Sequence, residues 1–215
     1  MKRRRYRPYP RSRAGAVLSL MRRVPGLRPV VFLIAVALAI LSFRQSPFLV
    51  PVAIPYDRAL YEHWIDSDGD CQDTRAEVLI ARSETPVQLS ADGCRVTKGR
   101  WRDAYSGIMI TDPTNLDIDH RIPLAEAHRS GADKWTAAER QAFANAITDP
   151  DVLVITQAST NRSKADGDPA SWLPLRGGQT CPYIAAWVRT KSRWHLTMDP
   201  IERGWVGVLT WLCAS

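Results

Sequence analysis

The sequence predicts an exported α+β domain, and three observations support this fold class. Short stretches of alternating polar and apolar residues, typical of strands, are interspersed with amphipathic runs that begin at helix-capping residues. All four cysteines lie in the C-terminal three-quarters of the chain, which fits a domain held by two disulfides. An apolar run behind a basic tail precedes this part of the chain and indicates export.

The formal net charge of +7 is concentrated at the N-terminus. Residues 1–44 carry eleven of the 29 Lys and Arg residues and no acidic residue. The remaining 171 residues therefore hold 18 basic and all 22 acidic residues, a net charge of −4. The folded part is mildly acidic, so it does not have the strong basic excess of a high-affinity nucleic-acid binder.

Residues 30–43, VVFLIAVALAILSF, form an uncharged run of fourteen. This run is long for the core of a signal peptide and short for a spanning helix, which needs roughly 17–25 residues. The triplet Ala37-Leu38-Ala39 lies inside the run, so no convincing cleavage site follows it. The preceding positive charges predict a cytoplasmic N-terminus. A cleaved signal peptide and an uncleaved signal anchor both remain open, and we favour the anchor, a single N-terminal membrane helix.

These features predict four regions along the chain. Residues 1–28 are a basic cytoplasmic tail, and residues 29–45 are the hydrophobic signal segment. Residues 46–57 are interrupted by prolines, which is typical of a linker. Residues 58–215 are the folded domain.

The four cysteines permit three disulfide pairings and contain no C-x-x-C pair, so a zinc site is a poor match. Residues 181–196 and 199–213 have helical periodicity. If these two helices pack antiparallel, the start of the first meets the end of the second. This arrangement favours Cys181–Cys213 and leaves Cys71 to pair with Cys94.

Several further elements can be assigned from local patterns. Residues 87–101 are expected to form a small hairpin near the start of the domain. Strands are expected near 116–119 and at 152–156, and helices at 74–84 and 136–147. Capping boxes, in which side chains satisfy the first backbone N–H groups, are expected at Thr74 with Glu77 and at Thr136 with Glu139.

The acidic stretch DSDGDCQDTRAE places Asp66, Asp68, Asp70 and Glu77 at positions 1, 3, 5 and 12 of a calcium-binding loop. The sixth position of such a loop is normally glycine, whereas here it is Cys71. We therefore favour an acidic turn that caps the following helix over a calcium site.

The stretch LDIDHRIPL, residues 116–124, alternates apolar and acidic residues and then has a histidine. The alternation predicts a strand with one solvated face, which carries the acidic residues. Hydrolysis of a phosphodiester needs a base to deprotonate water and a cation to hold the phosphate. His120 can serve as the base, and Asp119 offers an oxygen ligand for a hard cation. Asn161, early in a helix after the second strand, is a candidate second ligand. Lys164 shares its helical face and is a candidate for neutralising phosphate charge.

The runs DIDHRIPLAEAHRSGADKW, LVIT and NRSKADGDPASWLP resemble the HNH nucleases, whose core is a ββα-metal finger. The likeness is greatest to exported HNH proteins related to the C-terminal domain of GmrSD-type restriction endonucleases, and it covers about residues 56–213. The resemblance implies that His120 is the general base, that Asp119 is a metal ligand, and that Asn161 is the second ligand. In that family a middle asparagine helps to hold the catalytic histidine, and Asp151 is the nearest polar residue at that place.

Four residues are expected to support this site. Asp151 can accept a hydrogen bond from the His120 ring, and Arg162 or Lys164 can hold phosphate. Asp117 shares a strand face with Asp119 and is expected to support the ligands rather than to be one. Glu126 either orients the histidine or metal or forms a salt bridge at a helix surface.

The sequence thus predicts a metal-dependent endonuclease that cuts nucleic acid, with DNA as the favoured substrate and Mg²⁺, or else Mn²⁺, as the cofactor. The domain is expected outside the cell, attached to the membrane by the N-terminal helix or secreted. No protein partner can be inferred. The rival hypothesis is a catalytically inactive, disulfide-stapled module that binds a partner at the cell surface. A metal phosphodiesterase of smaller substrates is a third.

Overall fold

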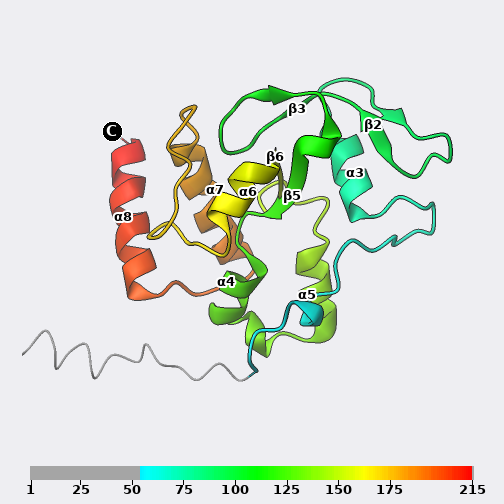
Figure 1. Ribbon diagram of the computed structural model, residues 1–215. Coiled ribbons are helices and arrows are strands. Elements are labelled where there is room, and N and C mark those ends of the chain that lie inside the picture. The colour runs from blue at the N-terminus through cyan, green and yellow to red at the C-terminus, as the bar shows by residue number, and fades with distance from the viewer. Residues whose placement is uncertain (1–53, 215) are drawn as a thin grey trace, which may run out of the picture. The chain divides into compact units, whose positions relative to one another are not determined.

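The computed structural model describes residues 54–214, which lie in the second of two compact units of the chain, residues 51–215 (Figure 1). The predicted tail, the signal segment and most of the predicted linker lie outside the described residues. Within residues 54–214, no helix combines the length and hydropathy needed to cross a bilayer.

The described elements confirm a mixed α+β architecture, in which small two-stranded sheets lie among short helices. The strands are β1 (Gln88–Leu89), β2 (Val96–Lys98), β3 (Trp101–Arg102), β4 (Met109–Ile110), β5 (Leu116–His120) and β6 (Leu153–Gln157). The helices are η1 (Arg58–Leu60), α3 (Thr74–Ala81), η2 (Pro113–Asn115), α4 (Leu124–Arg129), η3 (Ala132–Lys134), α5 (Ala137–Ala144), α6 (Ala158–Lys164), α7 (Thr180–Arg193) and α8 (Pro200–Ala214).

Strands β5 and β6 form the antiparallel pair at the centre of the domain. Their register pairs Leu116 with Gln157 at one end and His120 with Leu153 at the other. Helix α6 follows β6 without a loop and contacts both strands, as Figure 1 shows. The segment 121–152, which contains α4, η3 and α5, joins the two strands. Two strands and a helix are therefore packed together, with His120 at the end of the first strand.

The expectation of one solvated face on β5 is wrong. Asp119 and His120 are buried, and Asp117 is half-buried. Asp119 and Asp117 share the face that α6 and Tyr105 cover, so these carboxylates meet polar side chains instead of water. The alternation of polar and apolar residues predicted the strand correctly. The polar face of that strand, however, lies in a buried polar cluster and does not face solvent.

The predicted hairpin at 87–101 is confirmed by β1 and β2, and a second hairpin of β3 and β4 follows it. Trp101 fixes this region to α3, because its side chain is fully buried and its indole N–H donates to the Leu79 carbonyl at 2.8 Å. Helix α3 is capped by Asp73, which accepts from the Ala76 N–H, and not by the predicted Thr74. The capping box of Thr136 with Glu139 is confirmed at the start of α5.

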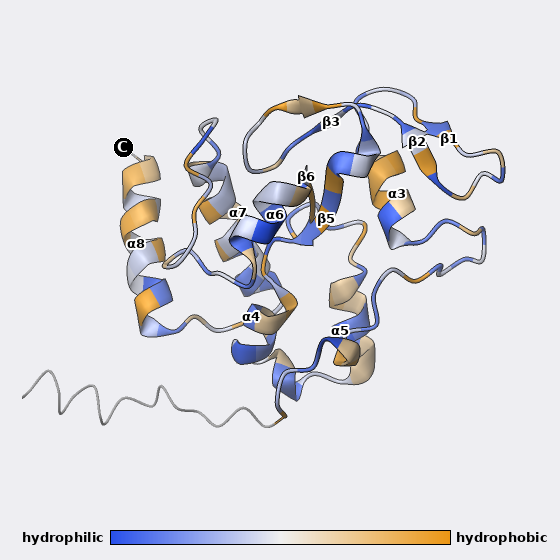
Figure 2. Ribbon diagram, viewed as in Figure 1, coloured by the Kyte–Doolittle hydropathy of each residue, from blue (hydrophilic) through white to orange (hydrophobic). Residues whose placement is uncertain are grey.

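Both predicted disulfides are present, Cys71–Cys94 and Cys181–Cys213. The second joins the start of α7 to the end of α8, and these two helices pack against each other as the sequence pattern requires. In Figure 2, α8 is coloured as hydrophobic along much of its length, and its Ile201, Trp205 and Val208 side chains are 49–63% exposed. The fold therefore leaves one apolar helix surface facing outward.

Candidate functional site

A cavity of about 260 Å³ brings the central predicted residues together. Its wall is built by the end of β5, the start of α4, helix α6 and the segment around η1. The residues that line it are Tyr56, Arg58, Ile118, Asp119, His120, Pro123, Leu124, Ala125, Asn161, Arg162, Ala165 and Asp166. His120, Asp119, Asn161 and Arg162 were predicted from the sequence, whereas Tyr56 and Arg58 were not.

The His120 ring is held in one orientation by the backbone. Its Nε2 lies 2.9 Å from the carbonyl oxygen of Ala144, and because a carbonyl can only accept, Nε2 carries the proton in the neutral ring. The Phe143 ring stacks beside the imidazole with centroids 6.1 Å apart, and the Trp64 ring lies at 5.9 Å. Nδ1 is consequently the unprotonated nitrogen, which is the atom able to accept a proton.

Burial lowers the pKa of His120 to about 3. The hydrogen bond to Ala144 acts in the opposite direction, and the positive charges of Arg58 and Lys164 add to the lowering. A histidine with this pKa is neutral at pH 7. The ring therefore has the protonation state that a general base requires, although its low pKa makes it a weak base.

Asp119 lies in a buried cluster with Lys164 and Tyr105. The Lys164 ammonium is 2.8 Å from Oδ2 and 3.1 Å from Oδ1, and the Tyr105 hydroxyl donates to Oδ2 at 2.6 Å. Lys164 also donates to the carbonyl of His120 at 2.9 Å and is only 2% exposed. Burial lowers the pKa of Lys164 and, together with the Asp119 charge, raises that of Tyr105.

These contacts correct the role expected for Lys164. Its charge neutralises the Asp119 carboxylate inside the domain, and its side chain does not reach solvent to hold a phosphate. Arg162, which is exposed and lines the cavity, is the α6 cation that remains available for that task.

Asn161 is positioned by Asp117, whose Oδ2 accepts from the Asn161 Nδ2 at 3.0 Å. This bond leaves the amide oxygen of Asn161 without a hydrogen-bond partner among residues 54–214. Asp117 thus holds the Asn161 amide in one orientation, and its role in supporting a metal ligand stays a prediction. Asn161 and Asp119 both line the cavity.

Asp151 and Glu126 lie in other interactions. Asp151 accepts two hydrogen bonds from Arg189 of α7, at 2.8 and 2.9 Å, which lower the pKa of its carboxyl. The expected bond from the His120 ring to Asp151 is replaced by the bond to Ala144. Glu126 accepts from the buried Lys191 ammonium at 2.7 Å. It anchors α4 to α7 and does not orient the histidine.

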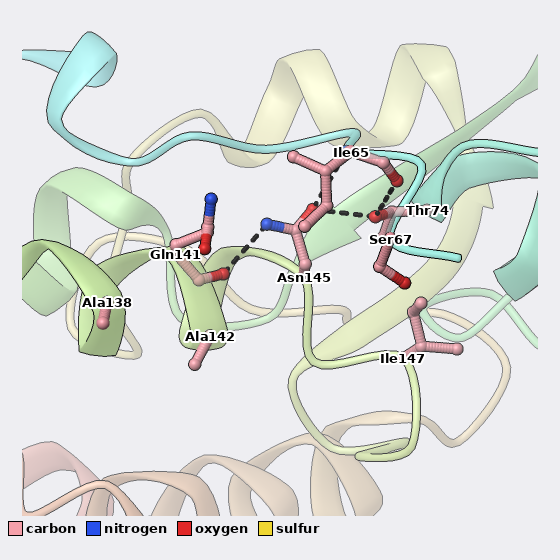
Figure 3. Close-up of a pocket in the computed structure, with 8 residues that line it drawn as sticks. All are labelled: Ile65, Ser67, Thr74, Ala138, Gln141, Ala142, Asn145 and Ile147. Atoms are coloured by element: carbon pink, nitrogen blue, oxygen red, sulfur yellow. Dashed lines mark hydrogen bonds between the residues drawn. The ribbon is translucent and has the colours of Figure 1, made fainter. Parts of the chain in front are cut away.

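The residue that fixes the Ala144 carbonyl is Asn145, which the sequence analysis missed. Figure 3 shows Asn145 at the end of α5, with its amide between Gln141, Ile65 and Thr74. Its Nδ2 donates to the carbonyls of Glu62 and Gln141 at 2.7 and 2.9 Å, and its Oδ1 accepts from the Thr74 hydroxyl at 2.7 Å. The predicted helix at 136–147 included Asn145, whereas α5 ends at Ala144, so the sequence pattern did not mark Asn145 as the residue that ends the helix.

The donor set at the cavity suits a hard cation. Asp119 and Asn161 offer oxygen atoms, the ligands that Mg²⁺ and Mn²⁺ prefer. Asn161 has an unpartnered amide oxygen within the described part of the chain, and Asp119 Oδ1 has a single donor at 3.1 Å. A second acidic group lies elsewhere: the carboxylates of Asp66, Asp68 and Asp70 approach within 4.8 Å of one another on an exposed turn. Asp66 and Asp70 also accept backbone N–H bonds there.

Comparison with known proteins gives one relationship. No protein-family model matches the chain. No solved structure matches it either. Over 148 residues the chain is 36% identical to an "uncharacterized secreted protein" of Arthroderma benhamiae. The match covers 69% of this chain and 71% of that protein.

Proposed function

Since this chain belongs to the same family as the secreted protein of Arthroderma benhamiae, we propose that it too is exported and that its domain is a metal-dependent endonuclease with an HNH-type core. One observation carries the catalytic part of the proposal. A neutral histidine, held through Nε2 by a backbone carbonyl, lies in the same cavity as the oxygen donors Asp119 and Asn161. The strand, strand and helix that position them have the order expected of a ββα finger.

His120 acts as the general base. Its Nδ1 accepts a proton from the water that attacks phosphorus, while Nε2–H stays on the Ala144 carbonyl and keeps the ring in place. The bond between phosphorus and the leaving oxygen then breaks, and the leaving oxygen takes a proton from solvent.

Asp119 and Asn161 are the residues that would hold the cation. When bound there, Mg²⁺ or Mn²⁺ supplies positive charge against the scissile phosphate and the leaving oxygen. Asp117 orients the Asn161 amide, and Lys164 forms an ion pair with the Asp119 carboxylate inside the domain. Arg162 adds an exposed guanidinium that suits a phosphate oxygen.

The favoured substrate is DNA without sequence selection. The domain beyond residue 44 has a net charge of −4, so it lacks the broad basic face that would give tight binding. Its contacts with nucleic acid are expected to be few and local to the cavity. The N-terminal segment is proposed to anchor the protein in the membrane unless it is cleaved.

The test is cleavage of plasmid and linear DNA by the full-length, oxidised protein with Mg²⁺, with Mn²⁺ or with EDTA. We expect cleavage that requires the cation and that His120→Asn abolishes. His195→Asn is the matched control, because His195 is an exposed histidine outside the cavity. Its backbone φ of 53° is a conformation that asparagine tolerates. Cleavage that persists in EDTA or in His120→Asn would overturn the proposal.

A second candidate, a surface-binding module without catalysis, is favoured by α8. Exposed apolar side chains on one helix are typical of an interaction surface, and Ile201, Trp205 and Val208 are exposed together. This candidate predicts no DNA cleavage with any cation. It also predicts that Trp205→Lys weakens attachment of the protein to cells that produce it, whereas His120→Asn has no effect on attachment.

A further inference from the structure

Two arginines in the cavity have no carboxylate partner among residues 54–214. Arg162 lies on α6, and Arg58 lies on η1, which is more than 50 residues earlier in the chain than β5. The acidic residues of the same cavity are already paired, Asp119 with Lys164 and Asp166 with Arg129. Neither guanidinium therefore forms an ion pair within residues 54–214, whereas both acidic residues that line the cavity do.

Arg58 is held at the cavity by a capped 3₁₀ turn and by a hydrogen bond to His63. The 3₁₀ turn that carries it is capped by Asp57, whose Oδ1 accepts from the Ala59 N–H at 2.9 Å. His63 Nδ1 lies 2.7 Å from the carbonyl of Tyr61 and must donate to it, so His63 Nε2 is the acceptor for the Arg58 Nη2, at 3.3 Å. The His63 ring thus orients the guanidinium through a hydrogen bond and supplies no negative charge to it.

Arg58 and the candidate base line the same cavity. An anion held beside the His120 ring therefore lies in the cavity that the Arg58 side chain also lines. Arg58 and Tyr56 approach the cavity from the N-terminal side of the domain, whereas Asn161 and Arg162 approach from α6. A ligand in this cavity is thus met by cations from two separate elements.

The charge balance limits what that ligand is. One phosphodiester carries a single negative charge, which a divalent cation and Arg162 already exceed. A second guanidinium without a counter-ion suits a ligand with a second phosphate. We propose that Arg58 binds the phosphate next to the scissile one, so that the site selects polynucleotides over isolated phosphodiesters. This inference rests on the proposed nuclease function.

The experiment compares full-length Arg58→Ala and Arg162→Ala with wild type and with Arg95→Ala. Arg95 is an exposed arginine beside the β1–β2 hairpin and does not line the cavity, so its loss removes the same charge elsewhere. Two substrates are used with Mn²⁺, a single-stranded oligonucleotide and bis(4-nitrophenyl) phosphate, which has one phosphodiester and no neighbouring phosphate. Oligonucleotide binding is measured separately by fluorescence anisotropy in EDTA over a range of salt concentrations.

We expect Arg58→Ala to weaken oligonucleotide binding by about tenfold and to reduce the slope of log affinity against log salt by about 0.7, the value for one lost phosphate contact on a single strand. Its KM for the oligonucleotide should rise, and its hydrolysis of bis(4-nitrophenyl) phosphate should fall far less than its cleavage of the oligonucleotide. Arg162→Ala should impair both substrates. Every variant keeps the same basic N-terminal tail, so the contribution of the tail to nucleic-acid binding is the same in all of them. Differences in affinity between the variants therefore come from the domain.

The outcomes separate this inference from the nuclease proposal. If wild type cleaves both substrates and Arg58→Ala matches Arg95→Ala in binding and cleavage, the second-phosphate site is refuted and the nuclease stands. If Arg58→Ala slows both substrates equally, Arg58 serves the scissile phosphate and the inference is again refuted. If wild type cleaves neither substrate, the nuclease proposal fails, and Arg58-dependent binding would have to appear in the anisotropy measurement for a two-phosphate site to survive.

Discussion

Burial of a neutral His120 makes the stability of the domain depend on pH in a way that can be calculated. The folded-state pKa is about 3, and the unfolded chain has the ordinary value of about 6.5. Below pH 6.5 the unfolded chain binds a proton that the folded domain does not bind until pH 3. Stability is therefore full above pH 6.5 and is lost as the pH falls toward 3. Between pH 7 and pH 4 this linkage amounts to about 3 kcal/mol.

The assay is urea unfolding followed by tryptophan fluorescence, at several pH values from 7 to 4, for wild type and His120→Asn. Other groups titrate in both proteins, so the difference between the two curves isolates His120. The variant is less stable at pH 7 because it leaves a cavity, but the wild type should lose about 3 kcal/mol more than the variant on going to pH 4. Parallel curves would refute the assignment of a buried, neutral His120.

Three other outcomes are expected. Lys164→Ala leaves the buried Asp119 carboxylate without its counter-ion and should lower the free energy of unfolding by about 3–5 kcal/mol, measured by urea denaturation at pH 7; a loss below 1 kcal/mol would contradict the ion pair. Asn145→Ala removes the hydrogen bonds of its amide to Thr74, Gln141 and Glu62 and should cost about 2 kcal/mol; it should also lower kcat more than KM, and wild-type kcat would contradict its positioning role. Replacing Cys181 and Cys213 by serine should cost about 4 kcal/mol, given their separation of 32 residues; an unchanged melting temperature would contradict this.

The part of the site that depends on local sequence patterns was predictable. Alternation in β5, the short apolar strand β6 and the polar helix after it place His120, Asp119 and Asn161 within one strand–strand–helix unit. The antiparallel packing of two helices with cysteines at their ends likewise predicted the Cys181–Cys213 disulfide.

The part that depends on segments far apart in the chain was not predictable. Lys164 is buried because α6 packs against β5, where its ammonium donates to Asp119 and to the His120 carbonyl. Helical spacing alone does not say which face of the seven-residue helix α6 is covered. Asp151 lies next to β6 in the sequence, but its carboxylate accepts a hydrogen bond from Arg189 on α7. Arg58 lines the cavity although it lies far from β5 and α6 in the sequence, and no local sequence pattern around it predicts this position.

The central claim is that His120 is the base in metal-dependent cleavage of nucleic acid, and chemical rescue tests it most directly. The rate of oligonucleotide cleavage with Mn²⁺ is measured for wild type and for His120→Ala, each with and without added imidazole. The account predicts that the variant is slower by about 10²–10⁴-fold, the usual contribution of a general base, and that imidazole restores part of the rate only in the variant. A variant that cleaves at the wild-type rate, or a wild type that cleaves with no cation supplied or not at all, would contradict it.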